Sequence, residues 1–147
     1  MDNCLRVVQE RADIFILIIG NRYGYQTDNE KLVTNLEYLR AKEKGIPIYA
    51  FIDKKVIQGI PLWKDNPEAN FDSLVDNPEL FRFVEQVMYE DSIWSYEYEL
   101  AEEISERLKF QLAYLFYDSL SLRKELVPNN FSKKKSWLLV LIYFKSF

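Results

Sequence analysis

The sequence predicts an α/β domain in which a parallel sheet is flanked by helices, with a long helix toward the carboxyl end. Residues 13–19 and 46–52 are almost continuously apolar, a pattern typical of strands buried on both faces in a parallel sheet. Residues 34–44 between them have a helical pattern, and Gly45 is placed to end that helix. We therefore expect two adjacent, parallel strands at the sheet centre, joined by a right-handed crossover through this helix.

The neighbouring segments carry weaker signals. Residues 2–11 have apolar side chains at helical spacing, which predicts a short helix before the first strand. Residues 54–76 are rich in Pro, Asn and Asp, and we expect an elaborated loop that holds no more than a short helical turn. Pro78 is placed to start a helix over residues 79–88.

The last third of the chain predicts a strand, a long helix and a tail. Residues 93–94 are expected as a short third strand, and residues 96–126 have the longest helical pattern. One face of this helix carries the apolar stripe Leu100, Ile104, Leu108, Leu112 and Leu115. Three further aromatic residues lie off that stripe: Phe110, Tyr114 and Tyr117. We place one domain at residues 1–126 and a basic, then apolar tail at residues 127–147.

Composition and charge exclude several classes of function. The net charge of −4 gives no general attraction for nucleic acid or anionic lipid. The chain has no histidine, which removes imidazole bases and nearly every zinc site, and its single Cys4 excludes an internal disulfide. No signal peptide and no apolar run of roughly 20 residues is evident. We expect a cytoplasmic protein with no metal, no cofactor, and no membrane or direct nucleic-acid partner.

Polar and aromatic residues gather where the first predicted strand ends. Residues 21–24 leave the strand at its carboxyl end, the edge where open α/β sheets bind ligands, and Glu37 lies one turn into the next helix. There a carboxylate can attack or stabilise a sugar carbon, an arginine can hold phosphate, and tyrosines can stack on a base or nicotinamide ring. We predict Glu37 as the catalytic residue. The predicted ligand-binding residues are Asn21, Arg22, Tyr23, Gly24 and Tyr38.

Structural explanations of the same residues remain open. Thr34 and Glu37 have the spacing of a capping box, in which Glu37 only satisfies the start of its own helix. Arg22 and the tyrosines are also ordinary residues for a loop and its rim. The glycines of the loop are too few for a phosphate-binding fingerprint.

These residues also resemble a known family. Residues 12–24 (ADIFILIIGNRYG), then Glu37, Tyr38 and Ala41, then KGIP at 44–47 and AFI at 50–52, resemble the domain of unknown function 4062. The likeness covers about residues 3–110. That family is similar to TIR domains and nucleoside deoxyribosyltransferases, which implies a TIR-like, flavodoxin-like fold. In those enzymes a helix glutamate just after this loop attacks or stabilises the sugar, and Glu37 occupies the matching position.

The resemblance also implies a partial domain. Family members open with a Val-Phe-Val-Ser-Ser strand and a helix, and the sequence before Cys4 does not supply them, so we expect a truncated start. The uncovered edge beside residues 13–19 then favours a homo-oligomer or a partner chain that completes the sheet. The alternative is that the tail at 127–147 folds back as the missing strand.

Two functions follow from these expectations, and the resemblance implies that either would serve a bacterial defence or signalling system. The first is an N-glycosidic hydrolase or transferase that acts on NAD or a nucleotide through Glu37. The second is a non-catalytic interaction or oligomerisation module.

Overall fold

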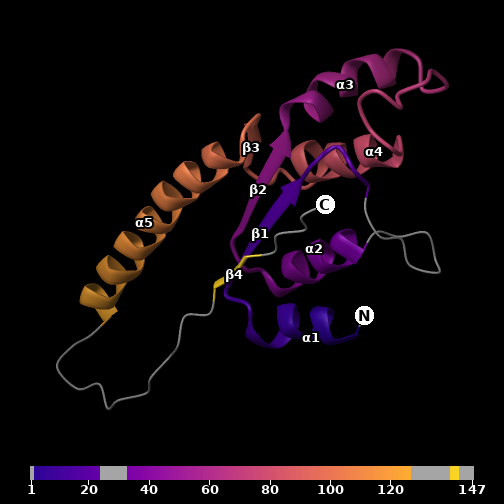
Figure 1. Ribbon diagram of the computed structural model, residues 1–147. Helices are drawn as coiled ribbons and strands as arrows, with labels where there is room; N and C mark the ends of the chain where they lie inside the picture. The colour runs from indigo at the N-terminus through magenta and orange to yellow at the C-terminus, as the bar shows by residue number, and fades with distance from the viewer. Residues whose placement is uncertain (1, 24–32, 127–139, 143–147) are drawn as a thin grey trace. The chain divides into compact units, whose positions relative to one another are not determined.

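The computed structural model describes residues 2–23, 33–126 and 140–142 (Figure 1). The chain divides into two compact units, of which the first comprises Met1–Glu99 with Leu138–Phe147 and the second Leu100–Trp137. The first unit contains the sheet and most of the helices. The long helix α5 (Ala101–Leu126) lies in the second unit. The predicted α/β class, with a parallel sheet, flanking helices and a long helix toward the carboxyl end, is confirmed.

The sheet is built around two parallel strands, as the sequence predicts. Its strand order is β3-β2-β1-β4, with β1 (Ile14–Ile19) and β2 (Ile48–Asp53) paired in parallel at the centre. The helix α2 (Val33–Lys44) connects them along the chain. The strand β3 (Ser95–Tyr98) pairs in parallel with β2 on its other side.

A segment of the predicted tail forms the fourth strand. In β4 (Val140–Ile142), Val140 pairs with Ile14 and Ile142 with Ile16, parallel to β1. The edge of β1 is therefore covered over its first half by the chain itself, which is the folding-back alternative. In the part of the chain that the structure describes, β4 does not reach Leu17–Ile19 of β1.

The predicted glycine at the end of α2 is confirmed. Gly45 has a φ of +71°, in the left-handed region that glycine adopts without steric cost. Its N–H donates to the carbonyl of Lys42 at 3.0 Å, and the N–H of Ile46 donates to the carbonyl of Ala41 at 3.4 Å. This pair of hydrogen bonds is a Schellman motif, which satisfies carbonyls at the helix end and turns the chain toward β2.

The prediction of a loop over residues 54–76 is wrong in its first half. Residues 54–65 form the helix α3 (Lys54–Asp65), and only the segment after it is irregular. Asp53 starts the helix, because its side chain accepts a hydrogen bond from the N–H of Lys55 at 2.8 Å. Val56 and Ile60 are buried one turn apart, which fixes the face that the helix turns to the core.

The helix propensities of its residues do not predict α3. Gly59 and Pro61 lie inside it, and both disfavour a helix interior, proline because it lacks the N–H that an α-helix needs. Burying Val56 and Ile60 contributes about 1.5–3 kcal/mol for each side chain. The tertiary contacts thus outweigh the local preference.

The elements after α3 agree with the prediction in kind but shift in position. The helix α4 (Glu79–Glu85) continues into the π-helical turn η1 (Gln86–Glu90), close to the predicted residues 79–88. The third strand is β3 at 95–98 and not residues 93–94, and the long helix begins at Ala101 and not at residue 96. The cause of the shift is the pairing of Tyr96 with Phe51, whose rings stack with centroids 5.8 Å apart.

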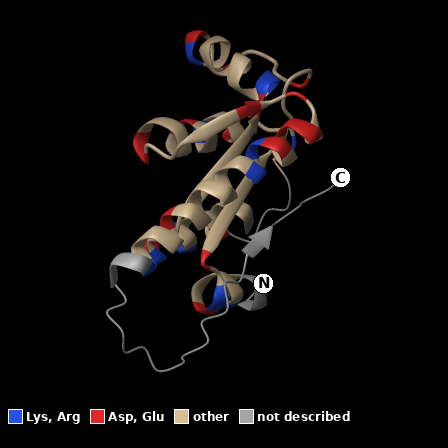
Figure 2. Cartoon of the chain, turned by 90° about the vertical axis from the view of Figure 1, so that its left-hand side faces the viewer, with Lys and Arg blue, Asp and Glu red and all other residues tan. Residues whose placement is uncertain are grey.

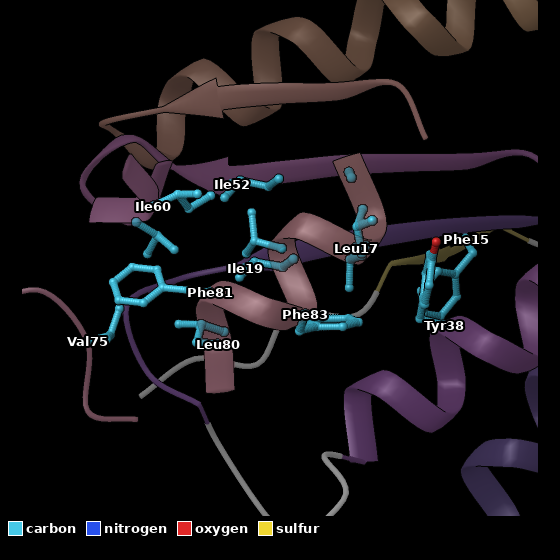
Figure 3. Packing of buried hydrophobic residues seen from close by; sticks show 14 of the residues in the cluster. Phe15, Leu17, Ile19, Tyr38, Ile52, Ile60, Val75, Leu80, Phe81 and Phe83 are labelled. Atoms are coloured by element: carbon cyan, nitrogen blue, oxygen red, sulfur yellow. The ribbon is translucent and has the colours of Figure 1, made fainter. Parts of the chain in front are cut away.

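The core lies between the sheet and the helices α2, α3 and α4 (Figure 3). Phe15, Leu17 and Ile19 alternate along β1 and turn the same face of the strand to this core. From the helix side come Tyr38 of α2 and the buried residues of α4, which are Leu80, Phe81, Phe83 and Val84. The helix α1 (Asp2–Arg11), which the sequence also predicts, adds Val8.

Helix α3 meets α4 at a very close contact. A Cβ atom on Gly59 would lie 2.7 Å from Cε1 of Phe81, inside normal contact distance. Phe81 is fully buried and is held edge-to-face by Phe71, with ring centroids 5.4 Å apart, and against Trp63 at 5.8 Å. The ring therefore has little room to move away, and Gly59 is needed for close approach.

We expect Gly59→Ala to destabilise the protein by about 1–3 kcal/mol through overpacking. The direction of this change in the free energy of unfolding is informative. Alanine is favoured over glycine in a helix by about 1 kcal/mol, so without the close contact Gly59→Ala would stabilise α3. Urea unfolding of the variant measures the change. Gln58→Ala, at an exposed site on the same helix, is the control, and a Gly59→Ala variant more stable than wild type would contradict the close contact.

Candidate functional site

The carboxyl ends of the central strands are tied together by Tyr98. This residue ends β3, and its hydroxyl donates to the carbonyl of Ile19, the last residue of β1, at 3.4 Å. The hydroxyl oxygen also lies 3.7 Å from the position that a Cβ atom would take on Gly20. Burial, and then the charge of Asp53 at the end of β2, raise the pKa of Tyr98 above its ordinary value. The ends of β1, β2 and β3 therefore share one polar environment.

The loop that leaves β1 is anchored through the backbone. The N–H of Tyr23 donates to Oδ1 of Asp76 at 2.6 Å, and the N–H of Asp76 donates to the carbonyl of Asn21 at 3.3 Å. This reciprocal pair fixes residues 21–23 against the segment before α4. The Tyr23 ring packs against the core, and burial followed by the charge of Glu79 raises its pKa. Asn21 and Arg22 are exposed, and Gly24 lies outside the described residues.

Glu37 is buried. Only 2% of its surface is exposed, and it is the one charged residue in the described part of the chain that is buried as a whole. The helix α2 begins at Val33, so that Thr34 takes the second helical position and not the N-cap position that a capping box requires. The capping-box explanation of Glu37 is therefore not supported. Enclosing a carboxylate is costly unless other groups compensate for the lost hydration.

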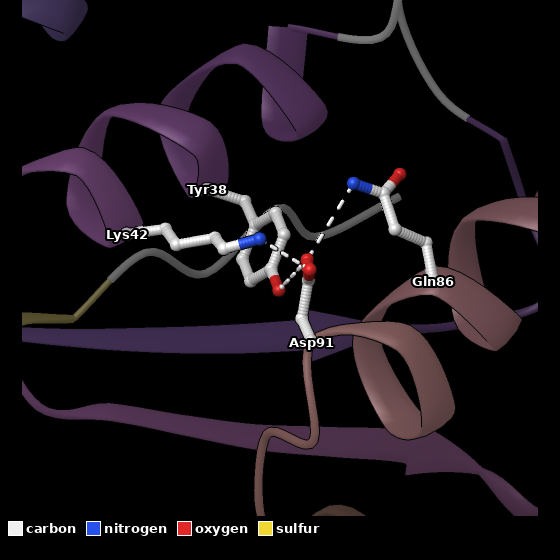
Figure 4. A network of polar contacts seen from close by, with 4 residues as sticks. All are labelled: Tyr38, Lys42, Gln86 and Asp91. Atoms are coloured by element: carbon white, nitrogen blue, oxygen red, sulfur yellow. Dashed lines mark hydrogen bonds and ion pairs between the residues drawn. The ribbon is translucent and has the colours of Figure 1, made fainter.

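Tyr38 belongs to a polar network with Asp91 (Figure 4). Its hydroxyl donates to Oδ2 of Asp91 at 2.6 Å, and Nζ of Lys42 forms an ion pair with Oδ1 of the same carboxylate. Nε2 of Gln86 donates to Oδ2 at 3.5 Å. The network joins the middle of α2 to the end of η1, two elements that no local sequence pattern connects.

Protonation states in this network follow from burial and charge. Burial is the largest influence on Tyr38, and with the hydrogen bond to Asp91 it raises the pKa of the phenol well above its ordinary value. Burial would also raise the pKa of Asp91. The hydrogen bonds from Lys42 and Tyr38 outweigh that effect and hold the pKa of Asp91 below 3.8, its ordinary value. At neutral pH, Asp91 is a carboxylate that accepts hydrogen bonds from a neutral phenol.

The predicted site residues thus occupy two settings. Asn21 and Tyr23 contact Asp76 through the backbone, whereas the Tyr38 hydroxyl is directed to Asp91. Sequence reasoning missed both aspartates. Each lies 53 residues from its tyrosine partner, and no spacing rule for helices or strands connects residues so far apart.

A second feature of the carboxyl edge is a cavity of about 310 Å³. It lies where β2 and β3 end and α3 begins, and its lining residues are Asp53, Lys54, Lys55, Gln58 and Glu99. Asp53 is occupied as the cap of α3, and Nζ of Lys54 lies 3.4 Å from Oε2 of Glu99. Four of the five lining residues are therefore ionisable, and Asp53, Lys54 and Glu99 already contact other groups of the protein.

Within the described ranges, no group of three or more acidic, cysteine or histidine side chains is arranged to hold a metal ion. Of the helices described, none has the length and apolar character needed to cross a membrane. Figure 2 shows basic and acidic residues interspersed along the elements.

We expect Asp91→Asn to destabilise the protein at pH 7 by about 1.5–3 kcal/mol, because hydrogen bonds to a charged group are lost. Since the pKa of Asp91 is lowered by folding, its contribution is present above pH 3.8 and is lost as the pH falls through the lower folded-state pKa. Urea unfolding at a series of pH values should therefore show the wild type and the variant converging in acid.

The matched control is Glu43→Gln, which breaks the exposed pair with Arg40 on the same helix. Glu43→Gln should lower the free energy of unfolding by less than about 1 kcal/mol. A difference between wild type and Asp91→Asn that stays constant below pH 3 would show that the charge of Asp91 is not the cause.

Comparison with known proteins identifies the family of the chain. Neither the curated proteins nor the solved structures that were compared contain a match. One family model matches residues 1–113, a range that includes the strands β1 to β3, the loop at 21–23 and the helix α2. Since the match covers more than half of the chain, the protein belongs to the family described as domain of unknown function 4062 (DUF4062).

Proposed function

We propose that this chain is a TIR-like domain of a bacterial defence or signalling system that cleaves an N-glycosidic bond of NAD or a nucleotide. The observation that carries the proposal is the burial of Glu37 in the helix that follows the β1 loop. Buried ionisable groups are concentrated at functional sites. The capping role that would explain this carboxylate without a ligand is not supported by the start of α2.

Cleavage of an N-glycosidic bond requires a carboxylate beside the sugar carbon that reacts. When the bond between the anomeric carbon and the base nitrogen breaks, the base leaves with the electron pair and positive charge develops on the sugar. The Glu37 carboxylate stabilises this oxocarbenium-like carbon or forms an ester with it, and water or an acceptor alcohol then supplies the oxygen that replaces the base. No imidazole is required, which agrees with a chain that has no histidine.

Arg22 has the chemistry to hold the phosphates of such a substrate. It is exposed, and it lies in the loop that leaves the carboxyl end of β1, the edge where open α/β sheets bind ligands. A guanidinium binds phosphate with two parallel hydrogen bonds. Its backbone neighbours on both sides are fixed through Asp76, which limits the movement of the loop at this point.

The decisive change is Glu37→Gln. We expect nicotinamide release from NAD to fall by about 10²–10³-fold or more, because an electrostatic contribution to the transition state is removed. The thermal unfolding midpoint and circular dichroism report whether the fold survives. Equal rates for the two proteins, or no release by the wild type from NAD or nucleosides, would refute the catalytic assignment.

A second change tests the binding role of Arg22. Arg22→Ala should raise KM for NAD by about tenfold while kcat changes less, because the contact to phosphate is made in ground and transition states alike. Arg40→Ala, which removes an exposed arginine on α2, is the control. An equal rise in KM for both variants would indicate an effect of net charge and not a phosphate contact.

A second candidate function is a non-catalytic interaction or oligomerisation module. Its support is the second unit, in which helix α5 leaves large apolar side chains exposed, among them Phe110, Tyr114 and Tyr117. For this function Glu37 has only a structural role, and no nucleotide is cleaved.

A further inference from the structure

The helix α5 has two apolar faces. On one face Ile104 and Leu108 are buried, and Leu112 and Leu115 are half-buried. At about 100° per residue, a second set of apolar residues falls on the opposite side of the helix. This set, which we name the α5 stripe, consists of Phe110, Ala113, Tyr114, Tyr117 and Leu120.

The α5 stripe is exposed to an unusual degree. Phe110 and Tyr114 are each 66% exposed, and Tyr117 is 70% exposed. Between these rings lies a hollow of about 330 Å³ that is lined by Phe110, Ala113, Tyr114 and Tyr117. A helix that is apolar on both faces is normally buried on both, and a contiguous exposed apolar patch marks a site of interaction.

We infer that the α5 stripe binds the same stripe of a second copy of this chain, with the two helices antiparallel. This inference rests on the second candidate function and names its partner. Phe110, Ala113, Tyr117 and Leu120 are spaced by three, four and three residues, the spacing of a helix–helix seam. When two such stripes run antiparallel about a twofold axis near residue 115, Phe110 meets Leu120 and Ala113 meets Tyr117.

Size favours this pairing. The small Ala113 leaves the hollow between the aromatic rings, and in the antiparallel arrangement it faces the large Tyr117 of the other copy. A large side chain that enters the space beside a small one fills an interface without voids. Because each stripe supplies both the hollow and the ring, the surface is self-complementary, as a twofold interface requires.

Charge favours the antiparallel direction. Glu102, Glu103 and Glu106 lie at the amino end of α5, and Arg123 is exposed near its carboxyl end. In the antiparallel pair, the acidic amino end of one helix lies alongside the carboxyl end of the other, where Arg123 is exposed. A parallel pair would bring the acidic ends together, where like charges repel. The antiparallel arrangement also opposes the two helix dipoles favourably.

The first test uses two leucines with equal exposure. Leu120 lies on the α5 stripe and Leu122 on the opposite side of the helix, and each is 55% exposed. Sedimentation velocity of the full chain should show a monomer–dimer equilibrium between about 1 and 100 µM, the range expected for a modest interface. Leu120→Glu should weaken association at least about tenfold, whereas Leu122→Glu should leave it within about twofold. A wild-type chain that is monomeric at 100 µM, or equal effects of the two changes, would overturn the inference.

The second test distinguishes the antiparallel from the parallel orientation of the two helices. It looks for stronger association, a result that a misfolded variant could not produce. In the antiparallel pair, Lys109 also comes near Arg123 of the other copy, so the natural interface contains a repulsion. Lys109→Glu should therefore strengthen association by about twofold to tenfold. Arg123→Glu should do the same, and the double variant should lose the gain, because two glutamates then face each other. Additive effects of the two changes, or none, would exclude the antiparallel pair.

Nicotinamide release separates this inference from the proposed catalysis. Leu120→Glu monomers that still release nicotinamide would show a catalytic site that works without the dimer. A Glu37→Gln chain that dimerises like wild type would show that the α5 interface stands whether or not the catalytic proposal holds.

Discussion

Burial of β1 on both faces is the constraint on which the rest of the fold depends. Five of its six side chains are buried and the sixth is half-buried, so the strand must lie inside a sheet with both faces covered. Such a strand does not set its own register, because a one-residue slip would exchange one apolar face for another. The register comes from its connection to α2 instead. Gly45 ends that helix at a fixed point, and Nζ of Lys44 donates to the carbonyl of Ala12 at 2.6 Å, just before β1 begins.

The second constraint is the contact between α3 and α4. Gly59 allows the Phe81 ring to approach the backbone of α3, which in turn fixes how closely α3 lies against the core. Asp53 ends β2 and caps α3 at the same time, so the position of that helix also determines which groups surround the carboxyl ends of β2 and β3. The contact between Gly59 and Phe81 therefore influences which polar groups surround the carboxyl ends of β2 and β3, about two helical turns away.

The central part of the fold, β1, α2 and β2, could be predicted because local sequence patterns determine it. Three signals predict the same strand–helix–strand unit, and each depends on residues close together in the sequence. They are the continuous apolar runs, the helical pattern between them and the glycine at the end of the helix. The helix α3 could not be predicted in this way, since Gly59 and Pro61 oppose it and only contacts with residues such as Phe81 reveal why it forms. Asp91 was missed for a related reason. Its partners Tyr38 and Lys42 are about fifty residues away, and the turn that presents it contains Ser92 at a φ of +53°, which nothing in the sequence signals.

The geometry of α2 separates the Asp91 network from Glu37. Tyr38 and Lys42 lie one turn apart and turn the same side of the helix to Asp91. Glu37 lies about 140° from Lys42 around the helix axis, so it is on a different side of α2 from the residues that contact Asp91. Glu37 is buried on this other side of the helix that follows the β1 loop, and the proposed catalysis depends on this placement and not on any role of α5.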